Sequence, residues 1–423
     1  MKEIARIARL REQEFSLLKG DANMKNFNIV MNKKAAERRE DISFFSVEEA
    51  AKACRFHSTF SVYQKTPLVS LGKLAAETGV KSIYLKDESY RFGLNAFKVL
   101  GASYAIANEI GGRIGMDICE LSAEGILSDE TRKKVGDITF VTATDGNHGR
   151  GVAWTANKLG QKSVVYMPKG SALERLENIR AEGAVADIVD MNYDEAVRLA
   201  QKMAEEKGWI VVQDTAWEGY ENIPRWIMQG YTTMGHEIME QIPERPTHIF
   251  LQAGVGSMAG AMTGFFSNLY AENKPMIVIV EPAKADCLYQ TAKADDGTLH
   301  IVTGDMDTIM AGLACGEPCT IGWDVLKGYA DAFIRCPEYM AADGMRILAA
   351  PAKGDTAVVS GESGAAAFGA MMNILLDDEL SEWKKTLGID ENSCILCIST
   401  EGDTDKENYR NVVWGGKYSK FDA

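Results

Sequence analysis

Short apolar runs rich in β-branched residues alternate with helix-like runs along the chain from Lys81 onward. Strands that alternate with helices form parallel sheets with helices on both faces, because a parallel connection needs a crossover segment between its strands. The candidate strands are SIYLK, DITFVTA, SVVYMP, VADIVD, WIVVQ, THIFLQA, MIVIVEP, TAVVSG and CILCIS. The sequence therefore predicts an α/β fold built on open parallel sheets.

The length of 423 residues allows two or three domains. No low-complexity linker separates two autonomous halves, so we expect the domains to be interwoven, with the ligand in the cleft between them. Four compact strand–helix units suggest a smaller inserted domain. The predicted division is an N-terminal extension over 1–23, a large domain over 24–136 and 215–423, and a small inserted domain over 137–214.

One helix of the small domain has a recognisable start signal. Ser171 and Glu174 follow the strand-like run SVVYMP with the spacing of a capping box. The pattern predicts a helix that begins near Ser171.

The charge balance excludes several classes of partner. The 46 basic and 60 acidic residues give a net charge of -14 without a long basic block, so nucleic acid and anionic membranes are poor partners. No apolar run approaches the ~20 residues that span a bilayer, and the N-terminus lacks the features of a signal peptide. We expect a cytoplasmic protein that acts on a small molecule.

Eight cysteines in a chain of this length do not indicate a disulfide framework. Cys394 and Cys397 form a C-x-x-C motif, but they lie in the strand-like run CILCIS, where positions three apart face opposite sides of a sheet. Cys287, Cys315 and Cys319 lie near glycine-rich or polar loops, where exposure and a redox-sensitive pair are open alternatives. No histidine has metal-ligand spacing, so we expect no catalytic transition metal.

Lys98 follows Phe97 in GLNAFKVLGA, behind the run SIYLKDE and at the start of a helix-like run. A lysine in this place can be buried and thereby reactive, although many such lysines only extend a solvated helix face. Three glycine-bearing loops favour the reactive interpretation, since each follows an apolar run: TATDGNHGRG around Asn147, QAGVGSMAG from Gly254, and ISTEGDTD around Ser399. Together they predict a cofactor pocket.

The loop QAGVGSMAG precedes an apolar helix and can direct successive backbone N–H groups at an anion. It matches neither the phosphate loop of nucleotide triphosphatases nor the G-x-G-x-x-G dinucleotide motif, so a single small phosphate is the better ligand. A tight turn that needs glycine for close packing is the alternative. A Schiff-base lysine and a monophosphate site together indicate pyridoxal 5'-phosphate.

The chain resembles the fold type II pyridoxal 5'-phosphate enzymes, the group of tryptophan synthase β and threonine dehydratase, and within that group the diaminopropionate ammonia-lyases. The resemblance runs from about Thr66 to Trp414. The motifs that carry it are KDESYRFGLNAFK, TDGNHGRG, QDTAWEGY, IPRWIMQGY, QAGVGSMAG, EPAKADC, AGLACGEP, SGESGA and STEGDTD. It implies two interwoven open parallel-sheet domains, a homodimer and a carbon–nitrogen lyase.

The resemblance also implies roles for single residues. Lys98 matches the lysine that links to the cofactor, Phe97 the residue beside its ring, and Asn147 the contact to its 3'-hydroxyl. Ser399 matches the hydroxyl that faces the pyridine nitrogen, with Thr400 as the alternative. The residues that match the phosphate loop are Gly254, Val255, Gly256, Ser257 and Met258.

The chain departs from the wider group at two places. Near the lysine, Ala96 and Leu100 replace the serine and arginine of the usual S-F-K-x-R-G-A pattern. In the asparagine loop, Asp145 occupies a position that usually holds a small or hydroxyl residue. A carboxylate there is costly unless it meets a cation or transfers a proton, so Asp145 indicates the substrate.

Other polar residues complete the predicted site. Asp214 ends the run WIVVQ and belongs in the cleft, with a helix or turn cap as the alternative. Thr144 lies beside Asp145 in the predicted substrate-binding set. Glu362 in SGESGA either lines the cofactor pocket or is a buried turn-forming acid. His148 is expected to pack at a helix start, and Tyr193 is typical of a core or wall residue.

The resemblance implies α,β-elimination of 2,3-diaminopropionate, as both D and L enantiomers, to pyruvate and ammonia. Lys98 and Asp145 would act as bases on opposite faces of the cofactor. A serine or threonine dehydratase shares the scaffold but does not need Asp145, and a β-replacement synthase needs a second nucleophile site. A protein that only binds the cofactor is a third alternative, against which the presence of Lys98 and Asp145 argues.

Overall fold

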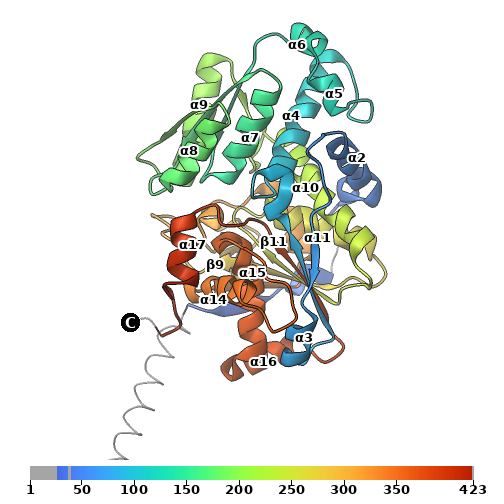
Figure 1. Ribbon diagram of the computed structural model, residues 1–423, viewed down its shortest axis with the longest axis vertical. Helices are drawn as coiled ribbons and strands as arrows, with labels where there is room; N and C mark the ends of the chain where they lie inside the picture. Colours follow the sequence, from blue (N-terminus) through green and yellow to red (C-terminus); the bar gives the residue numbers. More distant parts are fainter. Residues whose placement is uncertain (1–25, 37–39, 422–423) are drawn as a thin grey trace, which may run out of the picture.

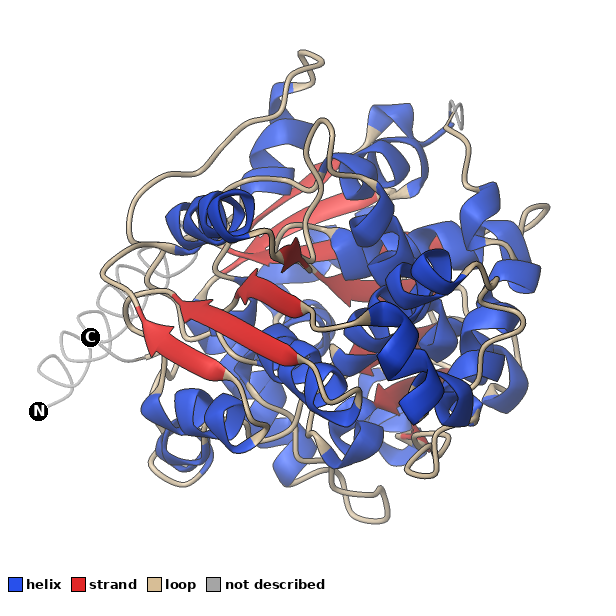
Figure 2. Cartoon of the chain, turned by 90° about the horizontal axis from the view of Figure 1, so that it is seen from above, coloured by secondary structure: helices blue, strands red, loops and turns tan. Residues whose placement is uncertain are grey.

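The computed structural model describes residues 26–36 and 40–421 of the chain. The predicted N-terminal extension, residues 1–23, lies outside the described residues. The chain forms two separate sheets, and helices cover both faces of them (Figure 1, Figure 2). The α/β class with predominantly parallel sheets is therefore confirmed.

The larger sheet has seven strands in the order β1-β10-β9-β8-β11-β3-β2. The inner strands pair in parallel, while β1 and β2 pair antiparallel at the two edges. Every residue of β8 and β11 is buried, which explains their nearly continuous apolar runs. The strands are β1 (Asn28–Met31), β2 (Leu68–Ser70), β3 (Ser82–Asp87), β8 (His248–Gln252), β9 (Met276–Pro282), β10 (Ala332–Cys336) and β11 (Cys394–Ser399).

The smaller sheet has four parallel strands in the order β6-β5-β4-β7. The chain leaves the larger sheet after β3, forms this sheet, and returns to the larger one at β8. The strands are β4 (Thr139–Ala143), β5 (Lys162–Met167), β6 (Val185–Ile188) and β7 (Ile210–Val211).

Helices from distant parts of the sequence pack in pairs around the sheets. α14 packs on α15, α10 on α4 and α2, and α11 on α13, while α7, α8 and α9 cover the smaller sheet (Figure 1). The helices are α2 (Val47–Ser58), α3 (Gly72–Thr78), α4 (Val99–Ile114), α5 (Ala123–Ile126), α6 (Asp129–Val135), α7 (Asn147–Lys158), α8 (Leu173–Ala181), α9 (Tyr193–Lys207), α10 (Asn222–Gln241), α11 (Ser257–Leu269), α12 (Cys287–Ala294), α13 (Thr320–Tyr329), α14 (Glu338–Ala349), α15 (Glu362–Leu376), α16 (Ser381–Thr386) and α17 (Lys406–Val413). Across residues 26–36 and 40–421, no helix has the length and apolar character needed to cross a bilayer.

The strand predictions are confirmed with one exception. The run TAVVSG, residues 356–361, forms no strand. Val358 in this run is buried, but its neighbour Val359 is exposed, so the segment lacks the two-sided burial of an inner parallel strand. The edge strands β1 and β2 and the inner strand β10 were not predicted.

The four strands of the smaller sheet lie within residues 137–214. Helix α4, which precedes that segment, packs against both α7 of the smaller unit and α10 of the larger one. Gly151 of α7 allows close contact with α4, since a Cβ at Gly151 would lie 2.9 Å from the Cα of Val99. The domain boundaries at 137 and 214 therefore stay a prediction.

The predicted capping box is wrong. Helix α8 begins at Leu173, and its N-cap residue Ala172 makes no side-chain cap. The Ser171 hydroxyl instead donates to the Pro168 carbonyl at 2.8 Å. Glu174 accepts from the backbone N–H and the ammonium of Lys406, so the chain uses this carboxylate for a contact between units.

The open alternatives for the cysteines are also settled. Cys287, Cys315 and Cys319 are all buried and unpaired, so the structure favours neither the exposed alternative nor a redox-sensitive pair. The loops that carry them fold inward against neighbouring elements. Cys394 and Cys397 are buried in β11, as their strand pattern predicted.

Candidate active site

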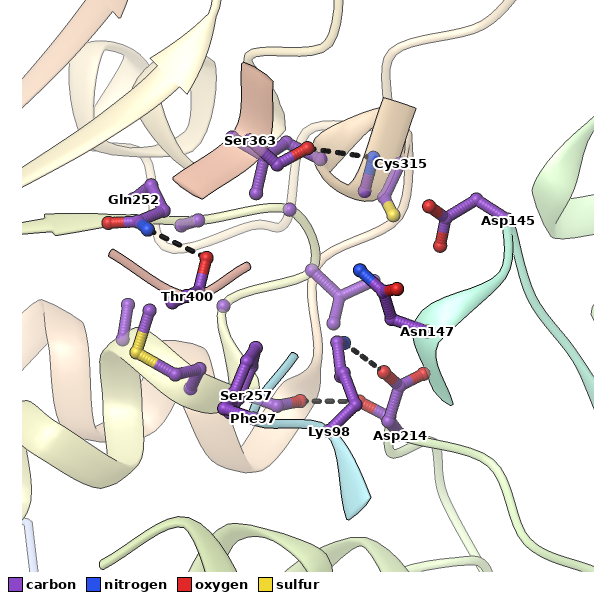
Figure 3. Close-up of a pocket in the computed structure, with 18 of the residues that line it drawn as sticks. Phe97, Lys98, Asp145, Asn147, Asp214, Gln252, Ser257, Cys315, Ser363 and Thr400 are labelled. Carbon is purple, nitrogen blue, oxygen red and sulfur yellow. Dashed lines mark hydrogen bonds and ion pairs between the residues drawn. The ribbon is translucent and has the colours of Figure 1, made fainter. Parts of the chain in front are cut away.

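A cavity lies where the loops after β4, β7, β8 and β11 meet the start of α4 (Figure 3). Ligands of α/β proteins collect at the carboxyl ends of parallel strands, because the connecting loops converge there. The polar and aromatic lining residues are Phe97, Lys98, Thr144, Asp145, Asn147, Tyr193, Asp214, Gln252, Ser257, Cys315, Ser363, Thr400 and Glu401.

The loop between β8 and α11 forms one wall of the cavity, from Gly254 to Met258. Gly256 has a φ of 99°, a conformation that favours glycine. A Cβ at Gly254 would lie 3.1 Å from the sulfur of Cys315, so glycine is also needed for close packing. The first-turn N–H groups of α11 have no partner within the helix and can bind an anion.

Lys98 immediately precedes α4, and its ammonium forms an ion pair with the Asp214 carboxylate (Figure 3). The ammonium also lies 5.5 Å from the centre of the Phe97 ring. Burial opposes the charge on Lys98, but the Asp214 carboxylate outweighs it and holds the pKa of Lys98 well above its ordinary value. Lys98 is therefore a partly exposed ammonium that can donate a proton into the cavity.

Asp214 follows β7 and lies beneath the cavity. Its carboxylate accepts a hydrogen bond from the Tyr193 hydroxyl at 3.2 Å, and its backbone carbonyl accepts one from Ser257 at 2.6 Å. Burial would raise the pKa of Asp214, but the His148 ring and the Lys98 ammonium lower it well below the ordinary value. Tyr193, expected only in the core or wall, is thus a direct partner of a site carboxylate.

Asp145 lies in the loop between β4 and α7, and its side chain is 18% exposed. Its carboxylate pairs with Nη1 of Arg175 at 2.9 Å. Burial raises the pKa of Asp145 above its ordinary value; Arg175 opposes the rise and Glu401 adds to it. Neighbouring Thr144 accepts a hydrogen bond from Gly146 N–H at 3.0 Å and also lines the cavity.

Asn147 begins α7, and its side-chain amide donates to the Glu401 carboxylate. Glu401 lines the cavity but was not predicted as a site residue. Glu401 follows closely after the buried strand β11. A position just after a buried apolar run is the signal that identified Asp214. His148 packs at the start of α7 as predicted, with its Nε2 2.7 Å from the Val212 carbonyl.

Of the two hydroxyls considered after β11, Thr400 lines the cavity and Ser399 does not. Thr400 accepts a hydrogen bond from the Gln252 amide at 2.9 Å, which holds its side chain in place (Figure 3). The Ser399 hydroxyl donates to Ser360 at 2.7 Å beneath the loop. The arrangement favours Thr400 as the hydroxyl that faces a ligand.

Of the two alternatives for Glu362, the structure favours the buried acid, since Glu362 is not among the described residues that line the cavity. Its carboxylate turns to the other side of the loop, where it accepts a hydrogen bond from Asn408 and lies 3.9 Å from Nη2 of Arg175. Burial raises the pKa of Glu362 to about 7. The next residue, Ser363, lines the cavity instead and accepts a hydrogen bond from Gly312 N–H at 3.0 Å.

A second hollow opens from the cavity toward the surface. The two share Asp145, Tyr193 and Cys315, and the outer one is bounded by residues 168–171 on the smaller unit and 305–308 on the larger. The outer hollow therefore lies next to the cavity that contains Lys98.

The lining residues fit pyridoxal 5'-phosphate. The glycine-bearing loop before α11 would hold the phosphate, since the first turn of α11 borders the cavity and its N–H groups have no partner within the helix. Phe97, Asn147 and Thr400 would contact the ring, and the Lys98 amine is available for a Schiff base.

Comparisons with known proteins agree with this site. Residues 60–389 match a family described as pyridoxal-phosphate dependent enzyme. The chain is 52% identical to a diaminopropionate ammonia-lyase of Salmonella typhimurium over 367 residues, which cover 86% of this chain and 91% of that protein.

Two crystal structures of the Escherichia coli diaminopropionate ammonia lyase have the same fold. The structure in complex with D-serine superposes with a TM-score of 0.87 at 45% identity and covers 93% of this chain and 98% of that one. The structure in complex with an aminoacrylate–PLP azomethine reaction intermediate superposes with a TM-score of 0.85 at 45% identity and the same coverage.

Proposed function

The chain belongs to the diaminopropionate ammonia-lyase family of pyridoxal-phosphate dependent enzymes, and we propose that it converts 2,3-diaminopropionate to pyruvate and ammonia. The substrate loses its α-proton and its β-amine, which leaves 2-aminoacrylate. Hydrolysis of 2-aminoacrylate then gives pyruvate and a second ammonia.

The charge of the cavity is the observation that carries this proposal. The lining residues include three carboxylates, Asp145, Asp214 and Glu401, against the single ammonium of Lys98. 2,3-Diaminopropionate brings two amino groups and one carboxylate, so it carries the charge that this cavity lacks. Serine and threonine carry one amino group each and leave more of the buried negative charge without a partner.

Bound pyridoxal 5'-phosphate supplies the electron sink that stabilises negative charge at the substrate α-carbon. The chain supplies the groups that move protons. Lys98 reaches the cavity from the start of α4 and Asp145 from the loop before α7. We assign removal of the α-proton to Lys98 for the L enantiomer and to Asp145 for the D enantiomer, because the two enantiomers present this proton in opposite directions.

Departure of the β-amine needs a proton on its nitrogen. Asp214 keeps the Lys98 amine protonated when the two are paired, so Lys98 can return a proton at Nζ to the leaving nitrogen. The Tyr193 hydroxyl holds the Asp214 carboxylate from the other side. The carboxylates of the cavity also favour the protonated form of the substrate amine.

A pyruvate assay with the holoenzyme tests this proposal. We expect release of pyruvate from both D- and L-diaminopropionate, with much weaker release from serine and threonine at the same concentration. Activity confined to serine or threonine would indicate a dehydratase instead. Absence of ammonia release from all four compounds would leave a protein that only binds the cofactor.

Two further expectations concern the whole protein. We propose a cytoplasmic location, which is supported by the eight unpaired cysteines, since a reducing compartment keeps thiols free. The homodimer implied by the family resemblance stays a prediction, and light scattering of the purified holoenzyme checks it.

A further inference from the structure

Arg175 lies behind the loop that carries Asp145, on helix α8. Its side chain is 5% exposed and packs directly against the backbone of Gly146. A Cβ at Gly146 would lie 2.9 Å from Cδ of Arg175, and the φ of 153° at Gly146 also favours glycine. The Arg175 side chain therefore contacts the backbone of this loop directly, with no other side chain between them.

The guanidinium reaches past the loop to carboxylates from two units. Nη1 lies 2.9 Å from Asp145, and Nη2 lies 3.9 Å from Glu362 at the start of α15. Its Nε is buried and has no hydrogen-bond partner among the described residues. Glu401 and Asp405 also face the guanidinium and help to hold its charge.

Arg175 reaches the cavity by direct contact through Asp145, with which it pairs at 2.9 Å. Asp145 lines the cavity, whereas Arg175 is not among the described residues that do. The adjacent Glu174 binds Lys406 of α17 at 3.0 Å, so this end of α8 is fixed to the larger unit. The arginine is thus held in place independently of any ligand.

We propose that Arg175 is the positioning residue for Asp145, and that its fixed charge keeps the Asp145 carboxylate ionised and directed at the cavity. This inference rests on the proposed function, in which Asp145 takes the α-proton of the D enantiomer. Arg175 would then affect turnover of the D enantiomer more than turnover of the L enantiomer, because the L enantiomer loses its α-proton to Lys98.

The charges around Asp145 predict the direction of the effect. Asp145 faces the cations of Arg175 and Lys98 and the carboxylates of Glu401 and Asp214. Lys98 is already paired with Asp214. Loss of the arginine therefore leaves Asp145 beside carboxylates, and its pKa should rise by about one to three pH units, the usual worth of a neighbouring arginine.

The test compares Arg175→Gln, Arg175→Lys and the matched control Arg180→Gln, an arginine of the same helix that pairs with Glu177 at the surface. Because a base must be deprotonated, the acidic limb of the pH profile of kcat/KM for D-diaminopropionate should move to higher pH in Arg175→Gln. On that limb, turnover falls about tenfold for each unit of pKa shift. Arg175→Lys keeps the charge and should restore most of the profile, and Arg180→Gln should match the wild type.

A second readout needs no turnover. In an infrared titration of the holoenzyme, the carboxylate band that is lost in Asp145→Asn should titrate at higher pH in Arg175→Gln than in the wild type. The same midpoint in both proteins, or a shift of equal size in Arg175→Lys, would overturn the inference. A wild type that shows the infrared difference but releases no pyruvate from diaminopropionate would refute the proposed function alone.

Discussion

Two buried clusters of charged side chains lie in this molecule, and they differ in what they face. The internal cluster lies between β3 and α10 and consists of Lys86, Glu88, Arg91 and Glu237. The site cluster lines or supports the cavity and consists of Lys98, Asp145, Arg175, Asp214 and Glu401. Both contain the same residue types, so composition alone does not separate a structural cluster from a functional one.

The internal cluster is balanced and closed. Arg91 contacts Glu88 and Glu237 at 2.8 Å each, and Lys86 contacts Glu237 at 2.7 Å. All four side chains are fully buried, and Thr66 donates a further hydrogen bond to Glu88. Two cations pair with two carboxylates, so the charges of the internal cluster balance within the cluster.

The site cluster is unbalanced and open to a cavity. Its carboxylates outnumber its cations, and Nε of Arg175 and the nearby Nδ1 of His148 are buried without hydrogen-bond partners among the described residues. Shifted pKa values do not separate the two clusters, since paired Arg91 and Lys86 outweigh burial and lower the pKa of Glu237 to about 2. Unsatisfied charge next to a cavity distinguishes the functional cluster.

Removal of Lys98 should have the largest effect on function. Lys98→Ala removes the amine that would link the cofactor and move protons, so we expect at least about a 10⁴-fold loss of turnover. The visible absorption band of lysine-bound cofactor should disappear from the purified protein. An unchanged band in this variant would exclude Lys98 as the point of attachment.

Asp145→Asn removes a charge from the open cluster while keeping the size of the side chain. Turnover of D-diaminopropionate should fall by about 10² to 10⁴, the usual worth of general acid–base catalysis. The L enantiomer is the internal control and should lose less, because Lys98 takes its proton. Equal losses for both enantiomers would mean that Asp145 only binds the β-ammonium, and no loss would return it to a structural role.

Glu237→Gln tests the closed cluster. Removal of one partner from a buried ion pair leaves Arg91 and Lys86 short of a carboxylate, so unfolding by urea should show a loss of about 3–5 kcal/mol. The matched control is Glu240→Gln on the same helix, whose partially exposed pair with Lys65 should contribute little. The ratio of D to L turnover should stay at its wild-type value in both variants.

The same variant should also change the acid stability. The folded pKa of Glu237, about 2, lies below its ordinary value of 4.5. Its contribution to stability is therefore present above pH 4.5 and lost as the pH falls toward 2. Glu237→Gln should flatten the fall in stability across this window, and an unchanged slope would mean that other carboxyls cause it.

The sequence predicted most of the fold because inner parallel strands are buried on both faces and therefore carry continuous apolar runs. The edge strands β1 and β2 are short and only partly buried, so their pairing depends on neighbours that the local sequence does not reveal. The segment 356–361 has the composition of a strand, but it pairs with no strand of either sheet. Its apolar residues divide between the core and the surface.

The sequence placed residues at the cavity correctly where they follow closely after a strand, while their roles stay predictions. Asp145, Asn147 and Asp214 all line the cavity for this reason. Arg175 escaped prediction because it reaches Asp145 from a helix 30 residues further along the chain. Tyr193 is the first residue of helix α9, and only the fold brings its hydroxyl to the Asp214 carboxylate. This contact was therefore not predicted either.

The smallest expected effect is a gain in stability. Burial outweighs Arg175 and raises the pKa of Asp145 above its ordinary value of 3.8, so the folded protein binds this proton more tightly than the unfolded chain does. The stability linked to that proton is present below pH 3.8 and is lost as the pH rises through the folded pKa, so the charged group costs stability at neutral pH.

Asp145→Asn should therefore be more stable than the wild type at pH 7, by about 0.5–2 kcal/mol, the usual scale of a stabilising change at a strained functional position. Urea unfolding of both proteins without added substrate measures the difference. The gain should shrink as the pH falls toward 3.8, because the folded wild type then also carries a neutral carboxyl. Glu237→Gln should show the opposite sign at pH 7. A loss of stability in both variants would mean that the site cluster is as well satisfied as the internal one, and that the cavity alone separates them.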